Sequence, residues 1–207
     1  MIRLTYFFSI ALMLSSCSGF AVYQASYNFF KDNLIPDQQP LISESFFQDE
    51  KFSFALVRIG NAPEIKMVLA SIDNGLQKWV SSGRFSIITN SSGRILRTQG
   101  LLNDVSYVKL SESSESSINY IIDFYNPELL KIKGIEAIKK NPELINYKYF
   151  IDKDIQVSQI SFVTKIPVLK WSQVGILLQD EKKPVYTSQK IHPHFPRIQI
   201  NFYYKFD

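Results

Sequence analysis

Cysteine is almost absent from this chain, since its 207 residues include only Cys17. No disulfide can form within it, and motifs that use paired cysteines to bind zinc or exchange electrons are excluded. A chain of this length buries enough apolar surface to fold without covalent cross-links. We therefore expect a fold that depends on its apolar core.

The common signatures of catalysis and cofactor binding are also missing. The sequence has no Gly-rich phosphate loop, no serine elbow and no zinc motif. Its two histidines form His192-Pro193-His194, where the proline and the lack of a third ligand nearby favour a turn over a metal site. Asp152 and Asp154 favour a turn over a catalytic carboxylate pair, because Asp bonds its own backbone. We predict no enzyme activity, no metal and no cofactor.

The apolar run at the start of the chain, Tyr6 to Leu14 with one serine, is too short to span a bilayer. It follows Arg3 and precedes small residues, which is the layout of a secretory signal. The segment ends in Leu14-Ser15-Ser16-Cys17, which resembles the lipobox of bacterial lipoproteins. The sequence therefore predicts cleavage of residues 1–16 and lipidation of Cys17, whose acyl chains would anchor the protein in a membrane.

The residue after Cys17 is Ser18 and not Asp, which favours the outer membrane, with the domain facing the periplasm. The chain has a formal net charge of only +4. Because the protein is expected to be exported, we predict no nucleic-acid partner. The basic residues are either a solvated surface or a candidate contact for an anionic polysaccharide or lipid headgroups.

Residues 17–40 are predicted to form a lipidated N-terminus, with a helix over Ser18–Asp32 and a tether over Asn33–Pro40. Residues 41–207 are predicted to form one periplasmic domain. It begins with a short helix over Ile42–Gln48, for which Ser43 is the expected cap.

The rest of that domain is rich in strand patterns. Hairpins follow one another from 54 to 98, and Asn74-Gly75 predicts a type I′ turn. At least ten candidate strands predict a mainly β fold: a large antiparallel meander curled into a barrel-like or half-barrel sheet, with a few short helices. Asn126-Pro127-Glu128 and Asn141-Pro142-Glu143 predict short helical turns between 127 and 145, and Ser111–Ser117 an exposed tip.

Several stretches resemble the YjbF/GfcB family of capsule lipoproteins. They are Met67-Val68-Leu69-Ala70, the segment from Asn74 to Ser81, Ser92-Gly93-Arg94-Ile95, and Tyr186-Thr187-Ser188-Gln189 followed by His194-Phe195-Pro196. The Ser111–Ser117 tip and the paired Asn-Pro-Glu segments have no counterpart in that pattern. The resemblance implies an outer-membrane lipoprotein that serves capsule or exopolysaccharide production or export. It also implies a partner in the outer membrane from the same gene cluster.

Four residues of the resembling core are candidate contacts for a glycan or a partner: Gln77, Lys78, Trp79 and Arg94. The Trp79 ring could stack on the apolar face of a sugar. Alternatively it packs in the core, as Trp mostly does. Strand alternation places Gln77 and Trp79 on one side of the sheet and Lys78 on the other.

Three functions are compatible with these patterns. The first is a non-enzymatic accessory factor of polysaccharide production or export, which docks on an outer-membrane partner or on the polymer. The second is a carrier that holds a lipid or lipoprotein chain in a curled sheet, and this would need an apolar cavity. The third is a glycan-cleaving enzyme, which would need convergent carboxylates. A docking protein would show an exposed patch or sheet edge.

Overall fold

The structure is a computed structural model that describes residues 42–207, except for 102–103, 114–116, 127, 182, 206 and 207. The chain divides into two compact units, Met1–Gln38 and Gln39–Asp207, and the described residues all belong to the second. The predicted signal 1–16, the lipidation at Cys17, and the helix and tether of 17–40 lie outside the described residues. Within the described part, no helix has the length and apolar character needed to cross a membrane.

The short helix predicted at the start of the domain is confirmed as α3 (Glu44–Asp49). Ser43 is its N-cap, and the Ser43 hydroxyl accepts a hydrogen bond from the backbone N–H of Phe46 at 3.2 Å. Such a bond satisfies one of the N–H groups that a helix start leaves without a partner. The helix therefore begins where the serine predicts.

The mainly β, barrel-like antiparallel meander predicted from the sequence is confirmed by a 13-stranded sheet. The paired strands run antiparallel, and one short 3-10 helix, η1 (Pro167–Leu169), joins β10 to β11. In chain order the strands are β1 (Phe54–Ile59), β2 (Ile65–Asp73), β3 (Leu76–Val80), β4 (Ser86–Asn90), β5 (Ile95–Gln99), β6 (Asp104–Ser113), β7 (Ser117–Asn126), β8 (Glu128–Lys140), β9 (Ile145–Phe150), β10 (Lys153–Ile166), β11 (Trp171–Asp180), β12 (Lys183–Lys190) and β13 (Ile198–Tyr203).

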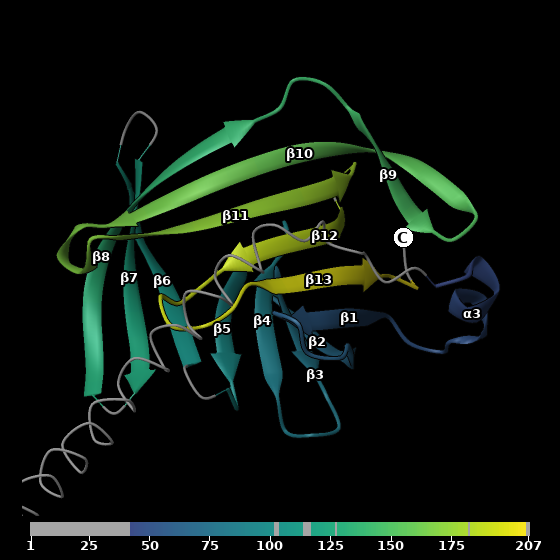
Figure 1. Cartoon of the computed structure of the whole chain (residues 1–207), viewed down its shortest axis with the longest axis horizontal. Coiled ribbons are helices and arrows are strands. Elements are labelled where there is room, and N and C mark those ends of the chain that lie inside the picture. The colour runs from purple at the N-terminus through teal and green to yellow at the C-terminus, as the bar shows by residue number, and fades with distance from the viewer. Residues whose placement is uncertain (1–41, 102–103, 114–116, 127, 182, 206–207) are drawn as a thin grey trace, which may run out of the picture. The chain divides into compact units, whose positions relative to one another are not determined.

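The order of the strands closes the sheet on itself (Figure 1). From β1 to β8 each strand pairs with the next one in the chain, and β8 then pairs with β10, β10 with β11, β11 with β12 and β12 with β13. The last strand, β13, pairs along its full length with β1. Closure gives each of these strands a neighbour on both sides, which removes the open edges of a flat sheet.

The hairpin between β2 and β3 turns at Asn74-Gly75, as predicted. Asn74 has a φ of 49° and Gly75 a φ of 75°, so both central residues are in the left-handed region that a type I′ turn requires. The Ser111–Ser117 segment forms the end of the β6–β7 hairpin, where Ser113 pairs with Ser117 around residues 114–116, which are outside the described part.

The helical turns predicted between 127 and 145 are wrong, because that segment is extended. Residues 128–140 form β8, which pairs with β7 on one side and β10 on the other. These two sets of ladder bonds outweigh the weak local preference of an Asn-Pro-Glu start for helix. The second Asn-Pro pair ends β8, and the chain resumes as β9 along the same β10 strand. At this break Asn141 accepts a hydrogen bond from the Glu143 N–H at 3.2 Å, an Asx turn.

The main core fills the inside of the closed sheet. It contains buried side chains from most strands: Ala55, Val57, Met67, Trp79, Phe85, Ile87, Ile95, Val105, Tyr107, Ile166, Ile191, Ile198, Ile200 and Phe202. Strand alternation sends Ile198, Ile200 and Phe202 of β13 inward, and sends Tyr203 to the outer side.

A second layer covers the outer side of β12 and β13. The Tyr147 hydroxyl of β9 donates to the Asn201 side chain, and the Tyr149 hydroxyl donates to the Phe202 carbonyl, each at 2.6 Å. Burial raises the pKa of both tyrosines, so their hydroxyls stay protonated as donors. The hairpin of β9 and the first half of β10 is thereby fixed over the sheet.

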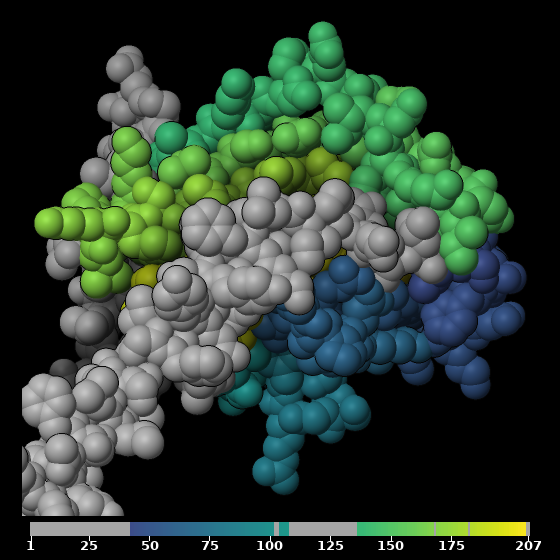
Figure 2. Space-filling view, in the orientation of Figure 1, coloured from purple at the N-terminus to yellow at the C-terminus, as the bar shows by residue number. Residues whose placement is uncertain are grey.

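Helix α3 closes one end of this second layer. The Phe47 ring packs against Phe150 and Tyr203, with centroids 5.6 and 6.2 Å away, and Lys153 forms an ion pair with Glu44 at 3.1 Å. Figure 2 shows the α3 segment in direct contact with the green segment around β9. The start of the described chain is therefore attached to the β9–β10 turn.

Candidate functional site

Trp79, the first candidate for glycan contact, lies in the core. It is 1% exposed, and its ring packs against Phe202 and Tyr204 with centroids 5.3 and 5.7 Å away. Its indole N–H donates to the Thr89 hydroxyl at 3.1 Å. A buried indole with a hydrogen-bond partner and aromatic neighbours fits the core alternative.

Gln77 and Lys78 follow the predicted alternation. Gln77 is buried beside Trp79, and its side-chain oxygen accepts from the Tyr204 hydroxyl at 2.7 Å. Lys78 is exposed on the opposite face of β3. In this conformation only Lys78 presents its side chain to a partner or a polymer, and such a contact stays a prediction.

Arg94 is the centre of a polar cluster inside the sheet. Its guanidinium forms an ion pair with Glu136 of β8, donates to the Thr164 hydroxyl of β10 at 3.1 Å, and approaches the Gln173 oxygen of β11 at 3.5 Å. The Thr164 hydroxyl donates in turn to Glu136 at 3.0 Å. Glu136 faces Thr164, and Thr164 faces Gln173, across neighbouring strands. Arg94 therefore links the β4–β5 turn to three strands on the far wall.

Aromatic rings enclose the Arg94 charge. The guanidinium carbon lies 4.3 Å from the centroid of the Phe162 ring and 6.0 Å from that of Tyr107. Burial raises the pKa of Tyr107, against a smaller lowering by the Arg94 charge, so its hydroxyl remains a donor to the Ile191 carbonyl at 2.5 Å. Cation–π contact and the carboxylate together compensate for removing the guanidinium from water.

Gln189 attaches the Arg94 segment to β12. Its side-chain oxygen accepts from the Ile95 N–H at 3.1 Å, and its amide nitrogen donates to the Gly93 carbonyl at 2.9 Å. Gly93 has a φ of 85°, and an added Cβ there would lie 2.7 Å from the Cβ of Pro184. Two stretches that carry the resemblance, Ser92–Ile95 and Tyr186–Gln189, are therefore neighbours in space.

Sequence reasoning found Arg94 and missed its partners. Nothing in the sequence connects Arg94 to Glu136, Thr164 or Gln173, because the contacts cross the inside of the sheet. The one available signal was the resembling stretch Tyr186-Thr187-Ser188-Gln189, which includes Gln189 but predicted no contact with Arg94. The burial of Arg94, which is 4% exposed, makes it an internal support of the fold in this conformation.

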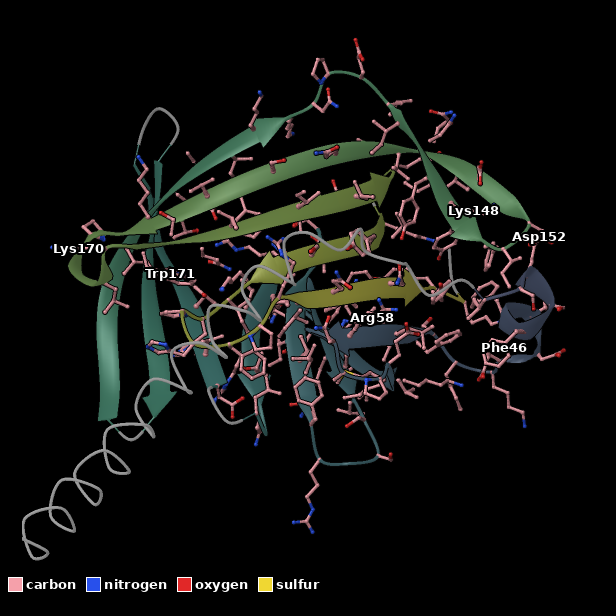
Figure 3. The ribbon with its side chains drawn as sticks, in the orientation of Figure 1. Phe46, Arg58, Lys148, Asp152, Lys170 and Trp171 are labelled. Atoms are coloured by element: carbon pink, nitrogen blue, oxygen red, sulfur yellow. The ribbon has the colours of Figure 1, made fainter. Side chains whose placement is uncertain are left out.

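The two histidines and Asp152 are on turns, as the sequence predicts, whereas Asp154 is the second residue of β10. His192 accepts a hydrogen bond at Nδ1 from the His194 N–H at 3.1 Å. Asp152 is in the exposed turn between β9 and β10, next to α3 (Figure 3). Trp171 lies at the opposite end of the domain in Figure 3 and packs partly buried against the main core. Among the described residues no group of three His, Cys, Asp or Glu side chains could hold a metal ion.

Comparison with known proteins gives a family match and a structural match. The family model described as group 4 capsule polysaccharide lipoprotein GfcB, YjbF matches residues 26–122. The crystal structure of the hypothetical lipoprotein YmcC from Escherichia coli (K12) superposes with a TM-score of 0.67 at 14% identity. The superposition covers 86% of this chain and 95% of that one. None of the curated proteins compared with the chain matches it.

The two matches carry different information. At 14% identity the structural match supports a shared fold alone, whereas the family match rests on the sequence. The matched residues contain the hairpins from 54 to 98, which carry most of the predicted resemblance. Over residues 26–122 the chain thus matches the YjbF family of group 4 capsule polysaccharide lipoproteins, which confirms the resemblance predicted from its sequence.

Proposed function

We propose that this protein is a non-enzymatic accessory factor in the production or export of a surface polysaccharide. A lipid on Cys17 holds it at the outer membrane, with its β domain in the periplasm. The observation that carries the proposal is the match of residues 26–122 to a family that is described as group 4 capsule polysaccharide lipoproteins. The lipobox that ends at Cys17 supports the anchor.

The inside of the sheet supports docking over the carrier alternative. A lipid carrier needs an apolar interior for a hydrocarbon chain. Here the interior contains the Arg94–Glu136 ion pair and the polar side chains of Thr164, Gln173 and Gln189, all buried. Buried polar and charged groups of this kind make the interior a poorer environment for hydrocarbon than an apolar cavity.

The carboxylates described above do not favour the enzyme alternative. Glycoside hydrolysis uses two carboxyl groups that face each other across a sugar. The Glu136 carboxylate is instead occupied by Arg94 and by the Thr164 hydroxyl. Asp152 and Asp154 are exposed near the tip of the β9–β10 hairpin.

The mechanism we favour is tethered docking. Lipidation confines the domain to a layer next to the outer membrane, which raises its effective concentration near a membrane-embedded partner. In this mechanism the effect on polysaccharide output depends mainly on the lipid anchor and on a docking surface of the domain. No single acid or base is needed.

The test is deletion of the gene, followed by complementation with the full-length protein. Deletion should reduce secreted or surface polysaccharide, and the wild-type chain should restore it. Cys17→Ala should restore it poorly, whereas Asp152→Ala and Asp154→Ala should restore it nearly fully. Normal polysaccharide output in the deletion strain would refute the proposal. Loss of output in an aspartate variant that still folds and reaches the membrane would favour an enzyme.

A further inference from the structure

The strands β8, β10, β11 and β12 are neighbours in the sheet (Figure 1), and β8, β10 and β12 carry basic residues on its outer face. Glu136, Thr164 and Gln173 point inward, so the residues that alternate with them point outward. We call this outward region the basic face. It comprises Ala137, Lys139, Ser161, Val163, Lys165, Ser172, Val174, Ile176, Lys190 and Arg197.

The strand register places an apolar strip along the middle of the basic face. Ala137 is opposite Val163, Val163 is opposite Val174, and Val174 is opposite Lys190. Ile176, 36% exposed, borders this strip on β11. The strip itself consists of small side chains, of which Ala137 is exposed and Val163 and Val174 are half-buried.

Cations flank the strip on both sides. Lys139 is opposite Ser161 on one side, and Lys165 is opposite Ser172 on the other. Arg197, just before β13, donates to the Ser188 hydroxyl at 3.1 Å. This partner is neutral and does not balance the charge of the guanidinium. None of the described positions of the basic face is acidic. Cations on a shared face attract a polyanion.

The spacing of the cations suits an extended polymer. Lys165 is opposite Ile135, four residues from Lys139 on β8, which corresponds to about 13 Å along the strand. Arg197 lies three strands from β10, or about 14 Å across the sheet. The strip runs across the strands, so a chain that lay along it would pass between Lys139 and Lys165, which flank it on neighbouring strands, and would reach Arg197 about 14 Å from β10.

We infer that the basic face binds an acidic polysaccharide chain. Carboxylates of the polymer pair with Lys139, Lys165 and Arg197, sugar C–H faces lie on the Val163–Val174 strip, and hydroxyls bond to serines of the same face. The inference rests on the proposed function and adds to it the chemical class of the polymer, an acidic polysaccharide. A membrane surface fits less well, because interfacial binding relies on projecting apolar side chains. Of the exposed large apolar side chains, Ile176 belongs to the basic face, whereas the aromatic Phe46 and Phe52 lie outside it.

The experiment measures binding of the full-length lipidated protein, purified in detergent, to fluorescent alginate, whose sugars each carry a carboxylate. Uncharged dextran is the control polymer. The test variant is Lys139→Gln/Lys165→Gln/Arg197→Gln. The matched control, Lys51→Gln/Arg97→Gln/Lys148→Gln, removes the same charge from exposed positions elsewhere. Circular dichroism and thermal unfolding verify that both variants are folded.

We expect the wild-type protein to bind alginate and not dextran, with affinity that falls as salt screens the charges. The test variant should bind about tenfold more weakly, because it loses three charge contacts of about twofold each. The control variant should bind like wild type. Equal weakening of both variants would mean attraction by net charge alone and would overturn the inference. Binding to anionic phospholipid vesicles but not to alginate would also overturn it, in favour of a lipid surface.

The two proposals fail in different ways. If the test variant loses alginate binding and also fails to restore polysaccharide output in the deletion strain, both proposals stand. If it loses binding but restores output fully, the basic face is irrelevant to the function, although the accessory role survives. If deletion itself leaves output unchanged, the accessory role fails whatever the alginate measurement shows.

Discussion

Replacing Glu136 with glutamine tests how strongly the internal ion pair stabilises the fold. Glu136 is 1% exposed and Arg94 is 4% exposed, so both charges are removed from water. The amide is similar in size to the carboxylate but uncharged, and the Arg94 guanidinium would lose the anion that compensates its burial. Breaking a buried pair on one side costs about 3–5 kcal/mol in free energy of unfolding. For a domain of this size that corresponds to a fall in Tm on the order of 10 °C.

The assay is urea and thermal unfolding of the full chain, followed by tryptophan fluorescence, because Trp79 is in the main core and Trp171 packs against it. The double variant Arg94→Met/Glu136→Leu removes both charges and should recover most of the loss, because apolar residues can replace a buried pair at little cost. Glu44→Gln is the matched control. It breaks the exposed Lys153–Glu44 pair and should cost less than about 1 kcal/mol.

Two results would refute this reasoning. One is a cost of less than about 1 kcal/mol for Glu136→Gln, which would mean that water reaches the pair. The other is a double variant less stable than the single one, which would mean that packing and hydrogen bonds to Thr164 dominate over charge.

Three further predictions concern the turns and the anchor. Gly93→Ala should cost several kcal/mol and Gly75→Ala about 1 kcal/mol in urea unfolding, since both have positive φ but only Gly93 has Pro184 within 4 Å of the added Cβ. Similar costs would contradict this geometry. Burial, with a smaller effect of the neighbouring histidine, lowers the pKa of His192 to about 4. The unfolded chain then binds this proton first, so stability should fall as pH drops from about 6.5 to 4, and less so in His192→Asn. Cys17→Ala should abolish palmitate labelling, and equal labelling of both proteins would exclude lipidation there.

The parts of the fold predicted from the sequence are those fixed by local chemistry. Ser43 caps α3 because its hydroxyl reaches an N–H in the next turn. The Asn74-Gly75 hairpin forms because these residues tolerate positive φ. Alternation along β3 correctly separated Lys78 from Trp79 and Gln77.

The parts that sequence reasoning missed depend on contacts between distant strands. Residues 128–140 carry helix-start chemistry at their beginning, yet two neighbouring strands hold them extended. Arg94 looked like a surface residue at a turn, but the closed sheet brings Glu136 to it across the interior. Local preferences are small compared with such pairings, and a single sequence does not reveal which strands will meet.

The pairing of β1 with β13 has a consequence for the order of folding. The first strand of the domain needs the last one, Ile198–Tyr203, as its neighbour. During synthesis or passage through a membrane, the chain must therefore wait for its C-terminus before the sheet can close. Until then β1 remains an open edge that can pair with other chains. Contacts between sequence ends also slow folding, because a long loop must close first. A nascent chain of this protein is therefore most exposed to aggregation and proteolysis in the interval before residues 198–203 arrive.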